Sequence, residues 1–174
     1  IKKVYIPKYI FPLEKVMFAF VNMLFSMIAL VIMMGVTKLG IIGSAADLNI
    51  SWTIVLFFIP MLYTLVFSLG LGLILAAVNV YFRDVGHLYS VWTMAWMYLT
   101  PIIYPMDIVE GTWVMNVIRL NPMYYFVTYF RDVVTNGTVP GLKTNLLCMG
   151  ISLLFLVLGL WVFKKKQDRF ILFI

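Results

Sequence analysis

The chain has 174 residues, of which 64% are hydrophobic and only 11% are charged. Soluble domains are about half apolar and a quarter charged, so this composition excludes an ordinary soluble protein and indicates an integral membrane protein. The formal net charge of +6 does not indicate binding to nucleic acid, because the basic residues cluster at the edges of apolar runs, where lipid headgroups attract them.

The chain begins with the basic sequence IKKVYIPK, without an initiator methionine. The first apolar run is not followed by the small-residue cleavage site of a signal peptide. We therefore expect this chain to be a fragment that lacks its natural N-terminus.

Four apolar runs are each long enough to cross about 30 Å of hydrocarbon as a helix, which takes roughly 20 residues. The runs are unbroken, whereas the strands of an outer-membrane barrel alternate apolar and polar residues. We therefore predict an all-α, polytopic transmembrane protein that forms a single domain over residues 1–174. The predicted spans cover residues 16–36, 52–81, 88–106 and 145–163.

The basic residues indicate which segments share a side of the membrane. Nine of them lie before the first span, between the second and third, or after the fourth, whereas four lie in the other connections. The positive-inside rule then places the segments 1–15 and 164–174, and so both ends of the chain, in the cytoplasm. Four spans satisfy this arrangement.

The sequence NVYFRDVGH, at residues 79–87, separates the second span from the third. A charged pair such as Arg83 and Asp84 is costly in lipid and cheap at the interface. We predict a tight cytoplasmic turn here, with Gly86 helping the chain to reverse.

The segment 107–143 is apolar enough to touch the membrane but carries several charges. The prolines at 101 and 105 end or bend the third span. Asn121 followed by Pro122 is a typical helix start, with the asparagine as N-cap. We predict two short extracytoplasmic helices, over 109–119 and 122–135. They lie at the interface or dip into the bilayer and return, and the sequence leaves both interpretations open.

Small residues recur every four positions on the second span, at Ser68, Gly72 and Ala76. Such a face lets helices approach closely, so we predict that it serves helix packing, within the subunit or across a dimer.

The residue types that build common active sites are sparse. Cys148 is the only cysteine and His87 the only histidine, so we predict no disulfide within the chain and no metal site. The sequence also contains no G-x-x-x-x-G-K-[ST] loop, so it has no phosphate cradle of that kind.

Several motifs occur together in a recognisable order: "IPKYIFPLEKV", "SLGLGLILAAVNVYFRDV", "LTPIIYP" and "NPMYYFVTYFRDVV", followed by a last span and a basic tail. This order resembles the permeases of the ABC type-2 transporters over essentially the whole chain. It is most similar to the branch that exports polysaccharides and polyol phosphates, such as teichoic acid, O-antigen and capsule. The resemblance implies six spans in the bacterial cytoplasmic (inner) membrane, of which the first two are missing here.

The resemblance also implies a partner ATPase that binds ATP and Mg²⁺, since this chain is expected to bind no cofactor itself. Residues 1–15 would dock into this partner as a coupling segment, and the turn after the second span would be a second contact. The alternative is a basic anchor whose side chains snorkel to the headgroups. The coupling residues expected from the resemblance are Pro7, Tyr9, Phe11, Glu14, Arg83 and Asp84.

Aromatic residues make up 17% of the chain. Trp92, Trp96 and Tyr98 on the third span would line a passage where rings stack on sugars, or they are aromatics that face lipid. An outer gate is expected at Asn121, Pro122, Tyr124, Tyr125 and Arg131. Arg131 would meet phosphate groups of a lipid-linked glycan or pair locally with Asp132.

We thus expect a permease subunit, itself without enzymatic activity, of an ATP-driven exporter. It would form a homodimer, contact membrane lipids, pair with two ABC ATPase subunits and export a lipid-linked polysaccharide or polyol-phosphate polymer. The closest alternative is an ABC type-2 exporter of a drug, lipid or other small molecule. An intramembrane transferase and a passive channel are more distant alternatives.

Overall fold

The computed structural model describes residues 9–39, 52–82, 84–104, 106–109 and 111–166. Every regular element in these ranges is a helix, which confirms the predicted fold class. The elements are α1 (Ile10–Lys38), the 3₁₀ helix η2 (Trp52–Phe57), α2 (Phe58–Asn79), α3 (Val85–Leu99), the 3₁₀ helix η3 (Met106–Ile108), α4 (Val114–Arg119), α5 (Pro122–Val134) and α6 (Leu142–Lys166).

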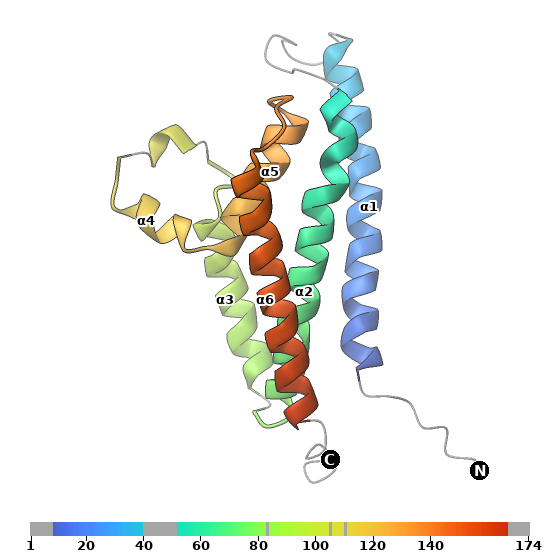
Figure 1. Ribbon diagram of the computed structural model, residues 1–174, viewed down its shortest axis with the longest axis vertical. Coiled ribbons are helices and arrows are strands. Elements are labelled where there is room, and N and C mark those ends of the chain that lie inside the picture. Colours follow the sequence, from blue (N-terminus) through green and yellow to red (C-terminus); the bar gives the residue numbers. More distant parts are fainter. Residues whose placement is uncertain (1–8, 40–51, 83, 105, 110, 167–174) are drawn as a thin grey trace, which may run out of the picture.

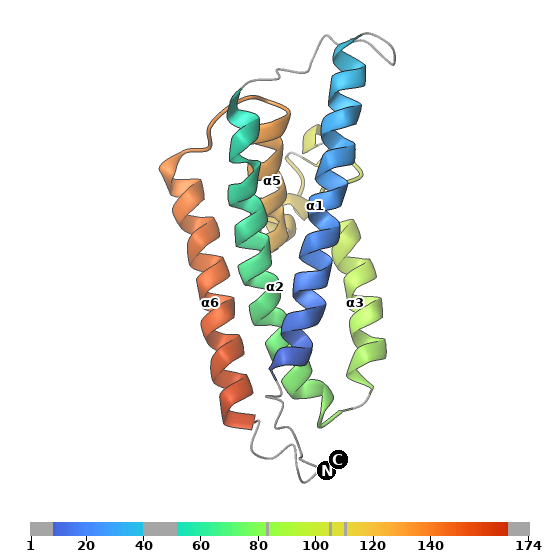
Figure 2. The ribbon, with the colours of Figure 1, turned by 90° about the vertical axis from the view of Figure 1, so that its right-hand side faces the viewer.

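Within the described ranges, three stretches of helix are long and apolar enough to cross a membrane: α1, η2 continued by α2, and α6. Figures 1 and 2 show these three helices side by side, with α2 between α1 and α6. Helix α2 contacts α1, α3, α5 and α6, so it is the centre of the bundle. The start of α1, the turn between α2 and α3, and the end of α6 lie at the same end of the bundle, which we call the basic end (Figure 1).

The contact between α2 and α6 is close because two glycines face each other. A Cβ atom added to Gly70 would lie 2.3 Å from the carbonyl oxygen of Phe155, and one added to Gly159 would lie 2.3 Å from that of Gly70. Real Cβ atoms do not approach backbone this closely, so larger side chains would push the helices apart. Ser152, about two turns before Gly159 on α6, donates hydrogen bonds to the carbonyls of Tyr63 (3.0 Å) and Cys148 (2.8 Å).

Helix α3 differs from the span predicted over 88–106. It begins at Val85 and ends at Leu99, and its 15 residues extend about 22 Å, less than the ~30 Å of a hydrocarbon core. The early end has a local cause: Thr100 is extended (φ −94°, ψ 125°), as the residue before a proline prefers. The prediction was therefore wrong about where this helix ends.

Two further boundaries correct the sequence predictions. Helix α1 already begins at Ile10, so residues 10–15 of the predicted cytoplasmic segment belong to the same helix as the first predicted span. Helix α4 covers only Val114–Arg119 of the predicted range 109–119, whereas α5 at Pro122–Val134 matches the predicted range 122–135 within one residue.

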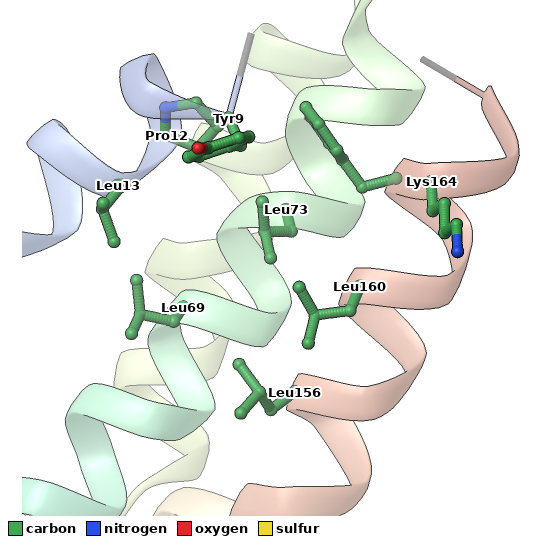
Figure 3. Close-up of a pocket in the computed structure, with 9 residues that line it drawn as sticks. Tyr9, Pro12, Leu13, Leu69, Leu73, Leu156, Leu160 and Lys164 are labelled. Atoms are coloured by element: carbon green, nitrogen blue, oxygen red, sulfur yellow. The ribbon is translucent and has the colours of Figure 1, made fainter. Parts of the chain in front are cut away.

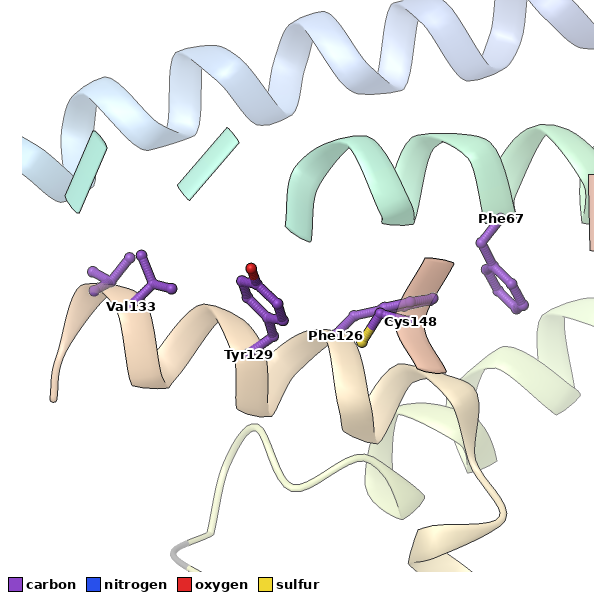
Figure 4. Close-up of a cluster of buried hydrophobic side chains, with 6 residues drawn as sticks. Phe67, Phe126, Tyr129, Val133 and Cys148 are labelled. Carbon is purple, nitrogen blue, oxygen red and sulfur yellow. The ribbon is translucent and has the colours of Figure 1, made fainter. Parts of the chain in front are cut away.

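Helix α5 packs against α2, η2 and α6. Its side chains Phe126, Tyr129 and Val133 are buried in one apolar cluster with Phe67 of α2 and Cys148 of α6 (Figure 4). In both ribbon views α5 lies beside the half of α2 and α6 farther from the basic end, not above these helices. Helix α5 is therefore packed along the side of the bundle.

Candidate functional site

The end of α3 and the start of α5 meet at one buried asparagine. The Oδ1 atom of Asn121 accepts hydrogen bonds from the indole Nε1 of Trp96 (2.6 Å) and the backbone nitrogen of Met123 (3.0 Å). Its Nδ2 atom donates to the hydroxyl of Thr100 (2.8 Å), which donates to the carbonyl of Trp96 (2.9 Å). Only 4% of Asn121 and 3% of Thr100 are exposed. Asn121, Thr100 and Trp96 form what we call the Asn121 junction.

The local sequence explains why these groups meet. Asn121 has an extended backbone (φ −80°, ψ 118°) and Pro122 follows at the first helical position, where its fixed φ suits the helix and its missing N–H costs nothing. The asparagine side chain then satisfies a backbone N–H that the helix itself leaves free. Thr100 precedes Pro101 in the same way, so two polar residues that each precede a proline face each other.

Two longer side chains add contacts around the junction. Arg131 donates from Nη2 to the carbonyl of Ile102 (3.2 Å), just after the bend that ends α3. The hydroxyl of Tyr125 donates to the carbonyl of Arg119 at the end of α4 (3.0 Å). Arg131 thus bonds a backbone carbonyl, and the Asp132 carboxylate accepts a hydrogen bond from the side chain of Asn136 (3.0 Å). The local Arg131–Asp132 pair, one of the two interpretations of Arg131, is not observed.

The residues predicted to line a passage do not share one environment. The rings of Trp92 and Trp96 pack edge to face with centroids 5.9 Å apart, and Trp96 also contacts Phe67 at 6.4 Å. Trp92 and Tyr98 are exposed, whereas Trp96 is half-buried. A cavity of about 540 Å³ between α2 and α3 has Trp92 and Trp96 on its wall, together with Leu71, Leu75, Val85, Leu88, Tyr89, Val91 and Ala95.

The residues predicted for an outer gate all lie on α5 or at its N-cap. Tyr124 and Tyr125 pack edge to face with centroids 5.1 Å apart. Asn121 bonds Trp96, so one residue of the predicted gate contacts one residue of the predicted passage. Thr100 was not among the predicted site residues, although it is part of the junction. The signal was present: a polar residue before each of two prolines in otherwise apolar sequence.

The predicted coupling residues lie at the basic end. Tyr9 is the N-cap of α1, Phe11 and Glu14 are exposed on its first turns, and Asp84 is exposed at the start of α3. Pro7 and Arg83 lie outside the described residues. Tyr9 also borders an apolar cavity of about 370 Å³ between α1, α2 and α6, shown in Figure 3. The cavity is lined by Tyr9, Pro12, Leu13, Leu69, Leu73, Leu156, Leu160, Phe163 and Lys164.

The three residues of the predicted packing face of α2 have different neighbours. A Cβ atom on Gly72 would lie 3.4 Å from Val16 of α1, and Ala76 packs beside Leu73, Ala77 and Phe163. Ser68 borders a smaller cavity between α2 and α3. The close contact between α2 and α6 instead uses Gly70 and Gly159, neither of which belongs to the predicted face.

The described residues supply aromatic faces, hydroxyls and one arginine around the junction. Within the described ranges, no group of three His, Cys, Asp or Glu side chains comes close enough to hold a metal ion. The arrangement is suited to positioning helices relative to one another.

These features define an integral membrane protein of the multi-pass helical class, in which two shorter helices, α3 and α5, meet beside the helices of spanning length. The chain belongs to the ABC-2 type transporter family, whose profile matches residues 2–135. The chain is therefore a transporter permease domain.

The chain is similar to curated permeases of O-antigen export systems. It is 28% identical over 172 residues to the O-antigen export system permease protein RfbA of Klebsiella pneumoniae, which covers 98% of this chain and 62% of that protein. A second Klebsiella pneumoniae protein of the same name is 26% identical with the same coverage. The RfbA of Myxococcus xanthus is 28% identical over 131 residues, 75% of this chain and 50% of that protein. The chain thus spans about half to three fifths of the length of these relatives.

Proposed function

We propose that the full-length protein is the membrane-spanning permease subunit of an ATP-driven exporter for a lipid-linked polysaccharide or polyol-phosphate polymer. The observation that carries this proposal is the similarity to O-antigen export permeases, which extends over 98% of the chain. The aromatic residues of α3 are consistent with it, because rings stack on sugar faces without gripping a moving polymer tightly.

The ATPase would be a separate chain that binds ATP and Mg²⁺, and two copies of the permease would enclose the passage. The basic end would face the cytoplasm of a bacterial cell and the protein would lie in its cytoplasmic membrane, as the positive-inside rule indicates. Tyr9, Phe11, Glu14 and Asp84 then lie on the side where an ATPase would dock. Pro7 and Arg83 belong to the same proposed interface.

On ATP binding, the ATPases would press on the start of α1 and on the turn before α3. Because α3 is joined to α5 through Asn121, a displacement of α3 would reach Tyr124, Tyr125 and Arg131 at the far side. The passage would open there, and the polymer would leave the cytoplasm.

The first test is a mild-detergent pull-down of the full-length protein from its own host, with the co-purifying chains identified by mass. We expect a stoichiometric subunit that carries a phosphate-binding loop. A chain that is repeatedly recovered alone would contradict the proposal and point to a channel or an enzyme.

The second test replaces the catalytic residues of that ATPase and measures the polymer on the cell surface. We expect export to stop, and export that continues unchanged would overturn the proposal. If deletion of the permease leaves surface glycans normal but sensitises the cells to a toxic compound, the cargo is a small molecule instead.

A further inference from the structure

Helix α3 is held loosely along its length. None of its residues is buried, and its packing within the described residues is mainly against α2. Apolar cavities of about 540 and 260 Å³ lie between the two helices, so few side-chain contacts oppose a movement of α3 relative to α2. At the basic end, α3 is connected to α2 by the short turn that contains Asp84.

Helix α5 is held firmly. Phe126, Tyr129 and Val133 have at most 3% of their surface exposed. The hydroxyl of Thr53 in η2 also donates a hydrogen bond to the carbonyl of Val133 (3.0 Å). The Asn121 junction therefore lies at the boundary between a loosely held helix and a firmly held one.

The contacts at the junction do more than cap a helix. Capping uses only the bond from the Met123 backbone nitrogen to Oδ1. The bonds to Trp96 and Thr100 reach the last turn of α3 and its C-cap. In a buried site without competing water, such bonds are stronger and an unmade one costs more.

We propose that Asn121 is a positioning residue that fixes the C-terminal end of α3 to α5 and thereby holds Trp92 and Trp96 beside α2. This inference deepens the proposed function, on which its transport readout rests. When the junction is intact, α3 and α5 move together. When it is broken, α3 moves independently, and its displacement by the ATPases at the basic end is no longer transmitted to α5.

The variants separate positioning from capping. Asn121→Ala removes both, whereas Asn121→Asp keeps the cap and the acceptor for Trp96 but loses the donor to Thr100. The double variant Thr100→Val with Trp96→Phe leaves Asn121 and its cap in place and removes both partners on α3. Asn116→Ala, at an exposed asparagine of the neighbouring α4, is the matched control.

The structural readout is the distance between spin labels in the purified full-length protein. Cysteines replace the exposed Met94 of α3 and Leu154 of α6 in a Cys148→Ala background, which itself must first reproduce the wild-type melting temperature. We expect the distance distribution to broaden with Asn121→Ala and with the double variant, and to stay narrow with Asn116→Ala. A narrow distribution in the double variant would mean that Asn121 only caps α5, and would overturn the inference.

The transport readout is the polymer exported per ATP hydrolysed. We expect a loss of about tenfold in the double variant, the effect of losing roughly two hydrogen bonds, with ATP hydrolysis within about twofold of wild type. Asn121→Asp should lie in between. Export and hydrolysis that stay coupled in the double variant would also contradict the inference.

The two readouts test the inference and the proposed function separately. If no ATPase is found but the spin-label distances broaden, the exporter proposal fails and the positioning role of Asn121 stands. If Asn121→Ala does not fold, the double variant carries the test, because it leaves the helix cap intact.

Discussion

At the scale of single residues, the glycines show how much depends on partners that are distant in sequence. Gly150 and Gly159 lie nine positions apart on α6, in equally apolar surroundings. A Cβ atom on Gly150 would meet nothing within 4 Å, whereas one on Gly159 would meet the backbone of Gly70. Nothing in the local sequence distinguishes the two, because the difference lies in the facing helix.

We expect Gly159→Ala to lower the melting temperature of the purified protein and Gly150→Ala to leave it unchanged or raise it slightly. The first substitution forces α2 and α6 apart, which costs about 1–3 kcal/mol in the free energy of unfolding. The second replaces glycine by a better helix former in open space. Equal melting temperatures for the two variants would show that α2 and α6 do not pack through these glycines.

At the scale of elements, the local sequence predicted the bounds of α5 well but did not predict which helices pack against it. Asn121 and Pro122 mark its start by local chemistry alone, and the structure confirms both the N-cap and the proline at the first position. What buries its apolar face is decided by α2, η2 and α6. The sequence therefore could not choose between an interfacial helix and a re-entrant one.

Phe126 and Tyr124 lie two positions apart on α5 and offer a matched pair. We expect Phe126→Ala to destabilise the protein by about 2 kcal/mol, because it leaves a cavity among Phe67, Tyr129 and Cys148. This is less than in a soluble core, since lipid is as apolar as the protein interior and the transfer part of the cost is small.

Tyr124→Ala should change the free energy of unfolding much less, because this ring is only partly buried and packs on Tyr125. Chemical unfolding in detergent measures both variants. Equal losses of stability would place α5 at the surface of the bundle and contradict the packing described here.

At the scale of the whole molecule, the sidedness that the basic residues indicate agrees with the arrangement of the helices. The start of α1, which carries Lys15, and the end of α6, which carries the lysines at 164–166, lie at the same end of the bundle (Figure 1), although more than a hundred residues separate them in the sequence. The positive-inside rule uses only the spacing of charges between apolar runs, so sequence suffices for this level of description.

This sidedness can be measured with single cysteines introduced into the full-length protein in a Cys148→Ala background. His87, exposed at the basic end, and Val139, exposed in the connection between α5 and α6, are the two positions. We expect a membrane-impermeant thiol reagent to label Val139→Cys in intact cells and His87→Cys only after the membrane is opened. The reverse pattern would invert the topology and place the proposed ATPase contact on the wrong side.

The sequence by itself determined the class of protein, three of the four helices predicted to span the membrane, the start of α5 and the sides on which charges gather. These depend on local chemistry: the cost of polar groups in lipid, the fixed φ of proline and the capping side chain of asparagine. Only the tertiary structure decided that Gly70 meets Gly159 and that Trp96 and Thr100 bond Asn121. Those facts depend on the space and the hydrogen-bond partners that one helix offers another. The sequence of a single helix does not specify which helix packs against it.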